Sequence, residues 1–201
     1  MHTKLKIIGL AGTNGSGKDT VGHILAEHHN YLFISVTDLL RAEAKRRNLP
    51  VKRDVLRTIS AEWRRQYGLG VLVDKALAEY EIVKDKYAGV VMASLRNPGE
   101  ADRIHQLGGS VVWIDADPHV RYDRVQANAA SRGRAEEDNK TFEQFLAEEA
   151  IEMQTQQGAD EATLNGSGVK DQTDVFLTND TTSLEEFKTI VKQSFQLTKI
   201  Y

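Results

Sequence analysis

The chain has 201 residues, with 26 lysines and arginines against 29 aspartates and glutamates, so its formal net charge of −3 excludes a strongly basic surface for duplex DNA. Hydrophobic residues make up 40% of the chain and charged residues 27%, which excludes a disordered chain or a fibre and fits one globular domain. There is no cysteine, and this excludes disulfides, thiolate nucleophiles and cysteine-ligated zinc or iron–sulfur sites.

Short runs rich in valine and isoleucine alternate along the chain with segments of helical periodicity. Five runs predict strands buried on both faces of a parallel sheet, at residues 5–10, 31–35, 88–93, 110–114 and 175–178. Six segments predict helices, at residues 21–28, 39–47, 53–67, 71–84, 100–107 and 120–130. Two capping boxes, Thr141 with Gln144 and Ser183 with Glu186, predict the starts of two more helices. The alternation predicts an α/β fold in which helices flank a five-stranded parallel sheet.

The charges are distributed unevenly along the chain. Residues 41–65 carry seven arginines and two lysines against three acids, whereas residues 135–162 carry nine acids against Lys140 alone. Most of these side chains are expected on solvated helix faces. Arginine also favours planar contacts with phosphate and carboxylate, so the basic segment is a candidate binding region for an anionic substrate.

The sequence between the first strand and the first helix matches the phosphate-binding pattern G-x-x-x-x-G-K-[ST] over residues 12–19, with aspartate at the final position. Its glycines let the backbone wrap so that successive N–H groups face one concavity, and the following helix adds the positive end of its dipole. The lysine adds a full charge for the β- and γ-phosphates of a nucleotide. The residues expected to contact the nucleotide are Asn14, Gly15, Ser16, Gly17, Lys18, Asp19 and Thr20.

Asp19 stands where this motif usually carries the hydroxyl that holds Mg²⁺. Carboxylate oxygens suit Mg²⁺, which keeps several of its waters in protein sites. We therefore expect Asp19 to hold the metal, directly or through water, and Thr20 to contact a phosphate.

Residues 165–168 repeat the letters of residues 14–17, Asn-Gly-Ser-Gly. Val169 follows in place of the lysine, and no predicted strand precedes the repeat. We expect a flexible loop there rather than a second phosphate site.

Two segments beyond the phosphate loop resemble nucleoside monophosphate kinases, a group of P-loop kinases. Residues 34–41, I-S-V-T-D-L-L-R, are similar to the adenylate-kinase segment I-S-T-G-D-L-L-R, with Val-Thr in place of Thr-Gly. In that family the arginine holds the phosphate of the acceptor nucleotide, which implies this role for Arg41. Residues 49–68 resemble the helical acceptor-side insert of phage-type deoxynucleoside monophosphate kinases.

The segment that follows the third predicted strand resembles a further motif of the phage-type group. Residues 94–100, S-L-R-N-P-G-E, are similar to its aspartate-x-arginine sequence with a glutamate close behind, which implies roles for Arg96 and Glu100. The aspartate itself is missing, because Ala93 and Ser94 stand at that point.

The sequence W-I-D-A-D-P at residues 113–118, with R-Y-D-R at 121–124, resembles the fourth strand and lid entry of dephospho-CoA kinases and adenylate-kinase-related proteins. The resemblance implies that lid arginines neutralise the charge of the transferring phosphoryl group. These arginines are Arg121, Arg124, Arg132 and Arg134. The C-terminal part of the chain is similar to adenylate-kinase-related proteins, which implies that Asn179 contacts the nucleotide base; a turn residue that ends the last strand is the alternative.

The resemblance spans most of the chain and implies one P-loop kinase domain over residues 1–201, with an acceptor-binding insert at about 37–84 and a lid at about 121–140. The expected reaction transfers the γ-phosphoryl group of ATP, with Mg²⁺, to a nucleoside or deoxynucleoside monophosphate. The expected catalytic residues are Lys18, Arg41, Arg96, Arg121 and Arg124.

Two alternatives remain open. A kinase of the dephospho-CoA kinase type would phosphorylate a hydroxyl group and would need a carboxylate base, for which Asp38 is the candidate, whereas a phosphate acceptor is already an anion. A nucleotide-binding protein without kinase turnover is suggested by Ala93 and Ser94 at the position of the missing acid.

The expected partners are ATP and an anionic small molecule, with neither nucleic acid nor membrane, and the chain is expected to be a monomer or a homodimer. No apolar run approaches the ~20 residues that span a bilayer, and no convincing targeting segment is present, so a cytoplasmic location is expected.

Overall fold

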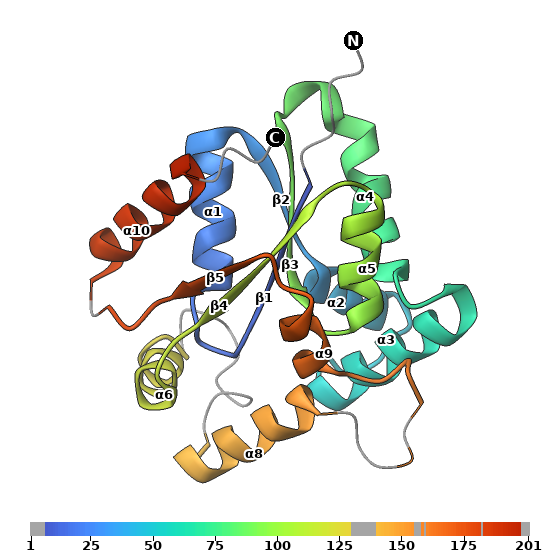
Figure 1. Cartoon of the computed structure of the whole chain (residues 1–201). Helices are drawn as coiled ribbons and strands as arrows, with labels where there is room; N and C mark the ends of the chain where they lie inside the picture. The colour runs from blue at the N-terminus through green and yellow to red at the C-terminus, as the bar shows by residue number, and fades with distance from the viewer. Residues whose placement is uncertain (1–6, 130–139, 155–157, 159, 182, 198–201) are drawn as a thin grey trace.

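A computed structural model describes residues 7–129, 140–154, 158, 160–181 and 183–197. Five parallel strands form one sheet in the order β2-β3-β1-β4-β5, which confirms the predicted fold class (Figure 1). The strands are β1 (Ile7–Gly12), β2 (Tyr31–Ser35), β3 (Gly89–Leu95), β4 (Ser110–Asp115) and β5 (Val175–Thr178).

Helices cover both faces of the sheet. The α-helices of the described residues are α1 (Lys18–His29), α2 (Val36–Arg46), α3 (Arg53–Tyr67), α4 (Val71–Val83), α5 (Pro98–Gln106), α6 (Pro118–Ala127), α8 (Phe142–Met153), α9 (Gly166–Asp171) and α10 (Leu184–Leu197). A short 3₁₀ turn, Lys84–Lys86, follows α4. Every described strand and most of the helices lie within a few residues of the ranges that the hydrophobic pattern predicts.

The central strand β1 shows why its sequence is apolar throughout. Ile7 and Ala11 belong to the core shared with α4, α5 and α9, whereas Ile8 and Leu10 belong to the core shared with α1 and α10. Successive side chains of a strand point to opposite faces, so a strand covered on both faces needs an apolar residue at almost every position.

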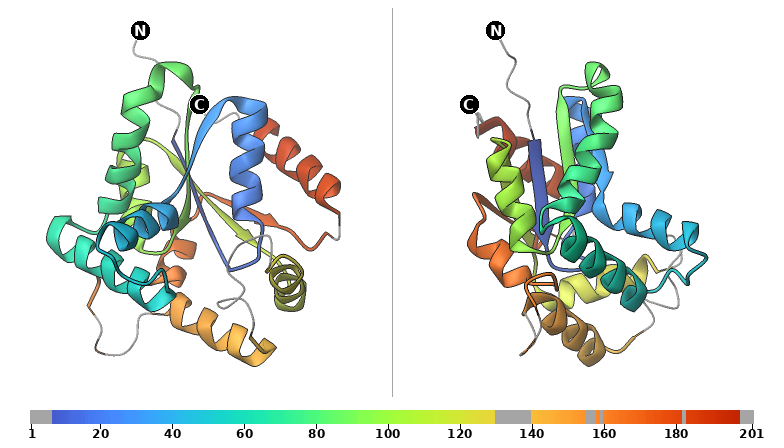
Figure 2. Two further views of the ribbon diagram at one scale, coloured as in Figure 1. Left: turned by 180° about the vertical axis from the view of Figure 1, so that it is seen from behind. Right: turned by 90° about the vertical axis from the view of Figure 1, so that its right-hand side faces the viewer.

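The carboxyl ends of the strands carry the loops and helices of interest. In Figure 1 the chain turns from the lower end of β1 into α1, and α3, α6 and α8 lie around that same end. The two views of Figure 2 place α8 at this end from other directions. Ligands of open parallel sheets bind outside the carboxyl ends of the strands, so this is the edge at which to look for a site.

The prediction of a flexible loop at residues 165–168 is wrong, because α9 begins there. The Asn165 side chain caps this helix by accepting a hydrogen bond from the Gly168 N–H at 2.9 Å, and Val169 is buried in the core. A Cβ at Gly166 would lie 2.9 Å from the Met153 sulfur, so glycine permits the close packing of α9 against the end of α8. Within the described ranges, none of the helices is both long and apolar enough to cross a membrane.

Candidate active site

The phosphate loop joins β1 to α1, as its sequence predicts. Gly12, Gly15 and Gly17 have positive φ angles of 139°, 80° and 97°, a region that residues with a Cβ rarely adopt. Gly17 is the N-cap of α1 and provides no side-chain cap, so the first N–H groups of the helix face the loop without a side-chain acceptor. The Lys18 side chain curls over the loop and donates a hydrogen bond to the Thr13 carbonyl at 3.0 Å.

The loop is packed tightly from behind, which fixes its shape. A Cβ at Gly15 would lie 2.6 Å from the Arg121 carbonyl oxygen, and a Cβ at Gly17 would lie 2.6 Å from the Asn179 amide nitrogen. The Ser16 side chain is fully buried, and its hydroxyl oxygen has no hydrogen-bond partner among the described residues. Ser16 lines neither of the two cavities described below, so its side chain lies behind the loop, and the predicted contact with a nucleotide could come only from its backbone.

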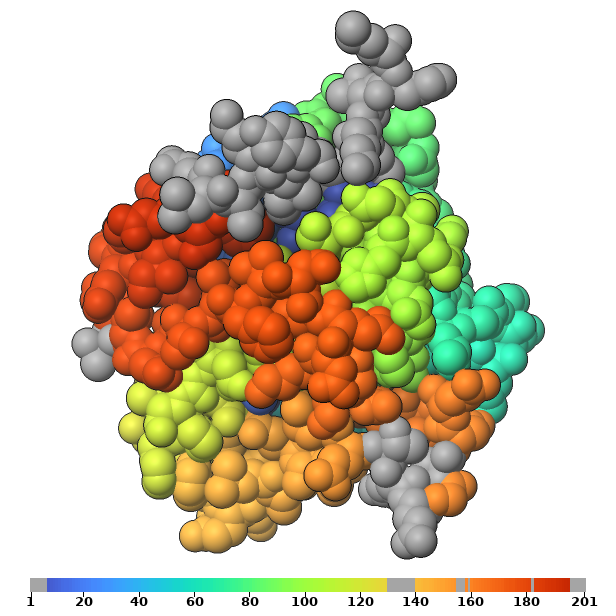
Figure 3. Space-filling model, in the orientation of Figure 1, coloured from blue at the N-terminus to red at the C-terminus, as the bar shows by residue number. Residues whose placement is uncertain are grey.

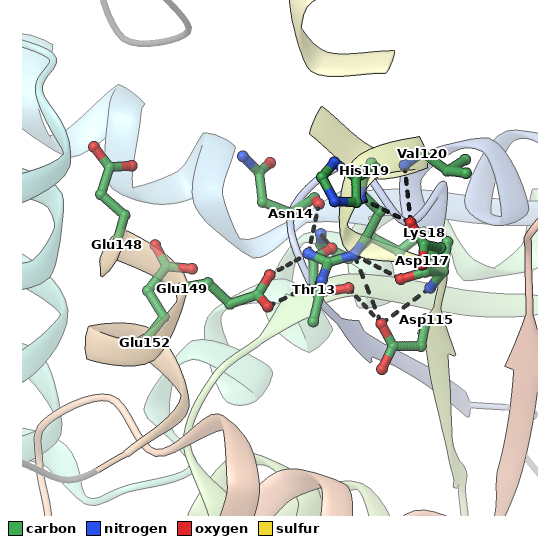
Figure 4. Close-up of polar contacts among 12 residues, drawn as sticks. Thr13, Asn14, Lys18, Asp115, Asp117, His119, Val120, Glu148, Glu149 and Glu152 are labelled. Carbon is green, nitrogen blue, oxygen red and sulfur yellow. Dashed lines mark hydrogen bonds and ion pairs between the residues drawn. The ribbon is translucent and has the colours of Figure 1, made fainter. Parts of the chain in front are cut away.

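Asp115, at the end of β4, holds the loop from the other side. Its carboxylate accepts a hydrogen bond from the Thr13 hydroxyl at 2.8 Å (Figure 4). It accepts a second one from the Trp113 indole N–H at 3.3 Å. Burial alone would raise the pKa of Asp115, but these hydrogen bonds, one from the Ala116 N–H and the charge of Arg121 hold it below its usual value. Asp115 is therefore a fixed anion that orients the start of the phosphate loop.

A cavity of about 540 Å³ opens on one side of the loop and is called here the donor-side cavity. The loop supplies Asn14, Gly15, Gly17, Lys18, Asp19 and Thr20 to its wall. Arg124 and Asn179 line the opposite wall and are hydrogen-bonded to each other: the Arg124 guanidinium donates to the Asn179 carbonyl at 2.9 Å. The Asn179 amide donates in turn to the Ser16 carbonyl at 2.8 Å. This hydrogen bond connects the residue that follows β5 to the phosphate loop.

A second cavity, of about 100 Å³, opens on the other side of the loop and is called here the arginine cavity. Five arginines line it: Arg41, Arg53, Arg57, Arg64 and Arg96. Asn14, Lys18 and Asp19 line both cavities, so the two share a wall at the start of α1. A group bound at the loop and a group bound by the arginines would therefore lie next to each other across this wall.

Helix α3 supplies most of the arginine cavity. Arg53, Arg57, Ser60 and Arg64 stand at i, i+4, i+7 and i+11, the spacing of one helix face. This stripe faces the cavity, while Leu56, Ile59 and Trp63 help to bury α3 in the core. Part of the basic segment noted in the sequence therefore forms a wall of the arginine cavity.

Arg64 has a structural partner inside the protein. It is 2% exposed and lies 2.7 Å from the carboxylate of Glu100, which is 0% exposed. The same Glu100 accepts a hydrogen bond from the Arg96 backbone N–H at 2.7 Å and completes the capping box of α5. Glu100 thus fixes the backbone that carries Arg96, which explains why an arginine and a glutamate four residues apart belong together here.

Glu152, near the end of α8, reaches into the arginine cavity. Its Oε1 accepts hydrogen bonds from Arg53 at 3.2 Å and Arg57 at 3.3 Å, and its Oε2 accepts one from Arg96. Although burial alone would raise its pKa, the charges of Arg96, Arg53 and Arg57 lower the pKa of Glu152 to about 2. Glu152 is ionised at neutral pH.

The structure brings most of the predicted site residues to the two cavities. Arg41 and Arg96 line the arginine cavity, and Arg124 and Asn179 line the donor-side cavity. Arg132 and Arg134 lie outside the described residues, so their predicted lid role is not tested.

Arg121 lies behind the loop rather than in the wall of either cavity. It is 2% exposed, donates to the Ala116 carbonyl at 2.8 Å and is paired with Glu149 of α8. Figure 4 shows Glu149 reaching from α8 toward Thr13 and Asn14. The Arg121 guanidinium also donates to the Asn14 carbonyl at 3.4 Å. This position suits support of the loop.

Four charged residues of the arginine cavity were not predicted individually from the sequence: Arg53, Arg57, Arg64 and Glu152. The helical spacing of the three arginines was a usable signal, since apolar residues of α3 occupy the intervening positions. Glu152 offered no local signal, because its arginine partners lie 95 and 99 residues away on α3 and 56 residues away after β3.

Asp19 is the residue best placed to hold Mg²⁺, because it lines both cavities beside Lys18. The described residues contain no group of three or more histidine, aspartate or glutamate side chains arranged for a metal ion. A site with one carboxylate fits Mg²⁺, which completes its shell with water and substrate phosphates.

Comparisons with known proteins agree with this architecture. Residues 8–148 match a family model described as an AAA domain. The chain is also 30% identical over 188 residues to a UPF0200 protein of Pyrobaculum aerophilum, an alignment that covers 92% of this chain and 93% of that protein. The chain belongs to the UPF0200 family and carries this AAA domain.

Kinases share the fold of this UPF0200 protein. A shikimate kinase of Symbiobacterium thermophilum is 30% identical over 123 residues, which cover 61% of this chain and 65% of that enzyme. The crystal structure of a shikimate kinase from Bacteroides thetaiotaomicron superposes with a TM-score of 0.60 at 16% identity and covers 96% of this chain and 97% of that one. The fold is that of P-loop kinases.

Proposed function

We propose that this UPF0200 protein is an ATP-dependent phosphotransferase that converts a nucleoside or deoxynucleoside monophosphate to the diphosphate. The observation that carries the proposal is the wall shared by the two cavities. Asn14, Lys18 and Asp19 lie between the donor-side cavity and the arginine cavity, which is lined by five arginines. Phosphoryl transfer consists mostly of positioning and charge neutralisation, and this arrangement supplies both.

On the donor side, the backbone N–H groups of the loop and the start of α1 would hold the phosphates of ATP, with Thr20 beside them. Lys18 would release the Thr13 carbonyl and donate to the β- and γ-phosphates. Arg124 would bind from the opposite wall, and Arg132 would add a further charge from the lid. Asn179 would hold the loop beside the base, since its amide is bonded to Ser16.

On the acceptor side, Arg41 and Arg96 would bind the phosphate of the monophosphate and point one of its oxygens at the γ-phosphorus. The new phosphorus–oxygen bond forms there as the bond between the γ-phosphorus and the bridging oxygen of ADP breaks. Because the attacking oxygen is already anionic, no proton has to be removed. Arg121 would keep the Asn14 carbonyl and the loop in place during transfer.

When bound, Mg²⁺ would offset the charge that develops on the phosphates. Asp19 and water would hold it at the start of α1. Asp19→Asn is expected to raise the Mg²⁺ concentration needed for half-maximal rate, and an unchanged Mg²⁺ dependence would show that the metal is held elsewhere.

A hydroxyl kinase is the second candidate, because shikimate kinases share the fold and a hydroxyl acceptor needs a base. The carboxylates that line the arginine cavity in the described residues are Asp19 and Glu152. Glu152, with a pKa of about 2, is a poor base. Asp38 is 66% exposed, is paired with Arg41 at 2.5 Å and does not line the cavity. With Asp19 assigned to Mg²⁺, no other carboxylate that lines the cavity in the described residues is suited to act as a base, which favours an acceptor that needs none.

The test is ADP production from ATP and Mg²⁺ in a coupled assay, with nucleoside monophosphates, dephospho-CoA and shikimate each offered separately. The proposal expects turnover with at least one monophosphate and background rates with the two hydroxyl acceptors. Turnover with dephospho-CoA or shikimate alone would establish the second candidate.

A nucleotide-binding protein without turnover is the outcome that would overturn both. Ser94 stands at the end of β3, where the related kinases place an acid, and its φ of 76° shows that the backbone turns sharply there. Tight ATP binding without transfer to any acceptor would show that the missing acid is essential. ATP is a metabolite of the cytoplasm, which is where this reaction would take place.

A further inference from the structure

Glu152 occupies the part of the molecule that an anionic substrate should occupy. It is 8% exposed although charged, and its two carboxylate oxygens contact three arginines from two different regions of the chain. Arg53 and Arg57 come from α3, and Arg96 comes from the turn between β3 and α5. These four side chains line the arginine cavity together with Lys18.

The contacts of Glu152 are those that arginine makes with a phosphate. A guanidinium donates to paired oxygens of a carboxylate or of a phosphate with the same planar geometry. A carboxylate carries one negative charge, whereas a phosphomonoester carries nearly two at neutral pH. A phosphate in this cavity would therefore compete for the same N–H groups and would hold the stronger charge.

Helix α8, which carries Glu152, is a surface helix held by a few apolar contacts and by several ion pairs. Phe142 and Phe145 contact the Tyr122 ring and Met153 packs against the core, but among the described residues of α8 only Phe145 and Glu152 are buried. Glu148 is paired with Lys140 at 2.5 Å and lies 3.4 Å from Arg53, and Glu149 is paired with Arg121, so α8 is also attached through carboxylates. Figure 3 shows α8, in orange, along the lower edge of the molecule. The Glu152 side chain can leave the arginines without opening the core of the sheet.

We propose that Glu152 is an internal competitor for the acceptor: it holds Arg53, Arg57 and Arg96 in the absence of substrate and gives them up to the anionic group of the incoming acceptor. This inference rests on the proposed function, because it takes the arginine cavity as the acceptor site. It makes Glu152 a determinant of acceptor specificity, since an anion that binds these arginines weakly does not displace it.

The experiment measures the binding of inorganic phosphate by isothermal titration calorimetry, with Mg²⁺ and a saturating non-hydrolysable ATP analogue that fills the phosphate loop. Glu152→Gln keeps the size and one carbonyl oxygen but removes the charge. It is expected to lower the dissociation constant for phosphate about tenfold, because one like charge leaves the site. Glu143→Gln is the control: it removes the same charge near the start of α8, from an exposed side chain that does not line the cavity, and is expected to stay within about twofold of wild type.

Phosphate binding to Glu152→Gln that is equal to or weaker than wild-type binding would overturn the inference and would show that Glu152 positions the arginines instead. Glu152→Asp covers the case in which the glutamine variant does not fold, since it keeps the charge and shortens the reach. It is expected to bind phosphate more tightly than wild type but less tightly than Glu152→Gln, and binding no tighter than wild type would again overturn the inference.

The proposed function is tested separately by this design. Binding of the ATP analogue is recorded before phosphate is added, and turnover is not part of the measurement. An analogue that does not bind would contradict the proposed donor site, while the phosphate titrations of wild type, Glu152→Gln and Glu143→Gln would still decide the role of Glu152.

Discussion

The two sides of the phosphate loop are built in different ways. One wall of the donor-side cavity is a continuous stretch of backbone, the phosphate loop and the start of α1, and the opposite wall comes from α6 and the segment between β5 and α10. The arginine cavity is formed by charged side chains from α2, α3, the turn after β3 and α8. A backbone cradle binds any phosphate chain with the right curvature, whereas side chains from several elements can change independently. The difference indicates where the specificity of this protein is encoded.

The largest expected effect comes from the wall that both cavities share. Lys18→Ala removes the charge that the motif directs at the β- and γ-phosphates, and it should reduce kcat by about a thousandfold or more. Transfer is measured by coupled ADP production, and the thermal midpoint of unfolding is the control for the fold. A kcat within tenfold of wild type would mean that the two cavities do not meet at Lys18 during catalysis.

Glu100→Ala tests the frame behind the arginine cavity. The substitution leaves the buried Arg64 without its partner and removes the acceptor of the Arg96 N–H, so we expect the free energy of unfolding to fall by about 3–5 kcal/mol. Urea denaturation measures this loss. Asp160→Ala is a suitable control, because its pair with Arg65 is about half exposed and solvent screens it, so its loss should change the free energy of unfolding far less. Similar losses from the two variants would contradict the assignment of Glu100 as a structural anchor.

The lowered pKa of Glu152 predicts that the contacts in the arginine cavity stabilise the fold to a degree that depends on pH. Its pKa is lowered in the folded protein to about 2, against 4.5 in the unfolded chain. A lowered pKa stabilises the fold above the unfolded value, so this contribution is complete above about pH 5 and is lost as the pH falls through 4.5 toward 2. The contribution is about 3 kcal/mol.

The measurement is the difference in unfolding free energy between wild type and Glu152→Gln as a function of pH. We expect this difference to shrink from pH 5 to pH 2, because the neutral amide has no charge to lose. A difference that stays constant over that window would mean that the arginines do not hold Glu152 as an anion.

Arg41→Ala gives the smallest effect and separates binding from chemistry on the acceptor side. Loss of one charged contact to the acceptor phosphate should raise its KM by about tenfold or more, with little change in the KM for ATP. Arg46→Ala is the matched control, since Arg46 lies on the same helix with a side chain that is 72% exposed and paired with Glu43. An acceptor KM that is the same in both variants would remove Arg41 from the acceptor site.

The sequence could predict the structural features that depend on residues close together in the chain. The phosphate loop, the strand before it and the helix after it follow from local glycine positions and apolar runs, and the capping sequences at Thr141 and Ser183 were readable for the same reason. The short helix α9 was missed because its stability comes from packing against Met153 and the core rather than from its glycine-rich letters.

The arginine cavity could be predicted only in part. Arg41 and Arg96 came from a resemblance to known kinases, and the arginines of α3 were visible as a basic segment but not as a binding face. The pairs of Arg64 with Glu100 and of Arg96 with Glu152 join residues 36 and 56 positions apart, so they depend on the tertiary fold. A charge pattern shows that such side chains exist, but only the fold shows which of them meet.

The central claim is that the acceptor atom is a phosphate oxygen. Phosphorus NMR of a reaction with ATP, Mg²⁺, a mixture of CMP, UMP, GMP and dTMP, and the hydroxyl acceptors shikimate and dephospho-CoA tests it most directly, because the chemical shift reports the type of bond formed. We expect the phosphomonoester signal of the monophosphates to decrease while two nucleoside diphosphates form for each ATP consumed, with no new phosphomonoester. A new phosphomonoester signal, or ATP that remains untransferred in the presence of every acceptor, would contradict it.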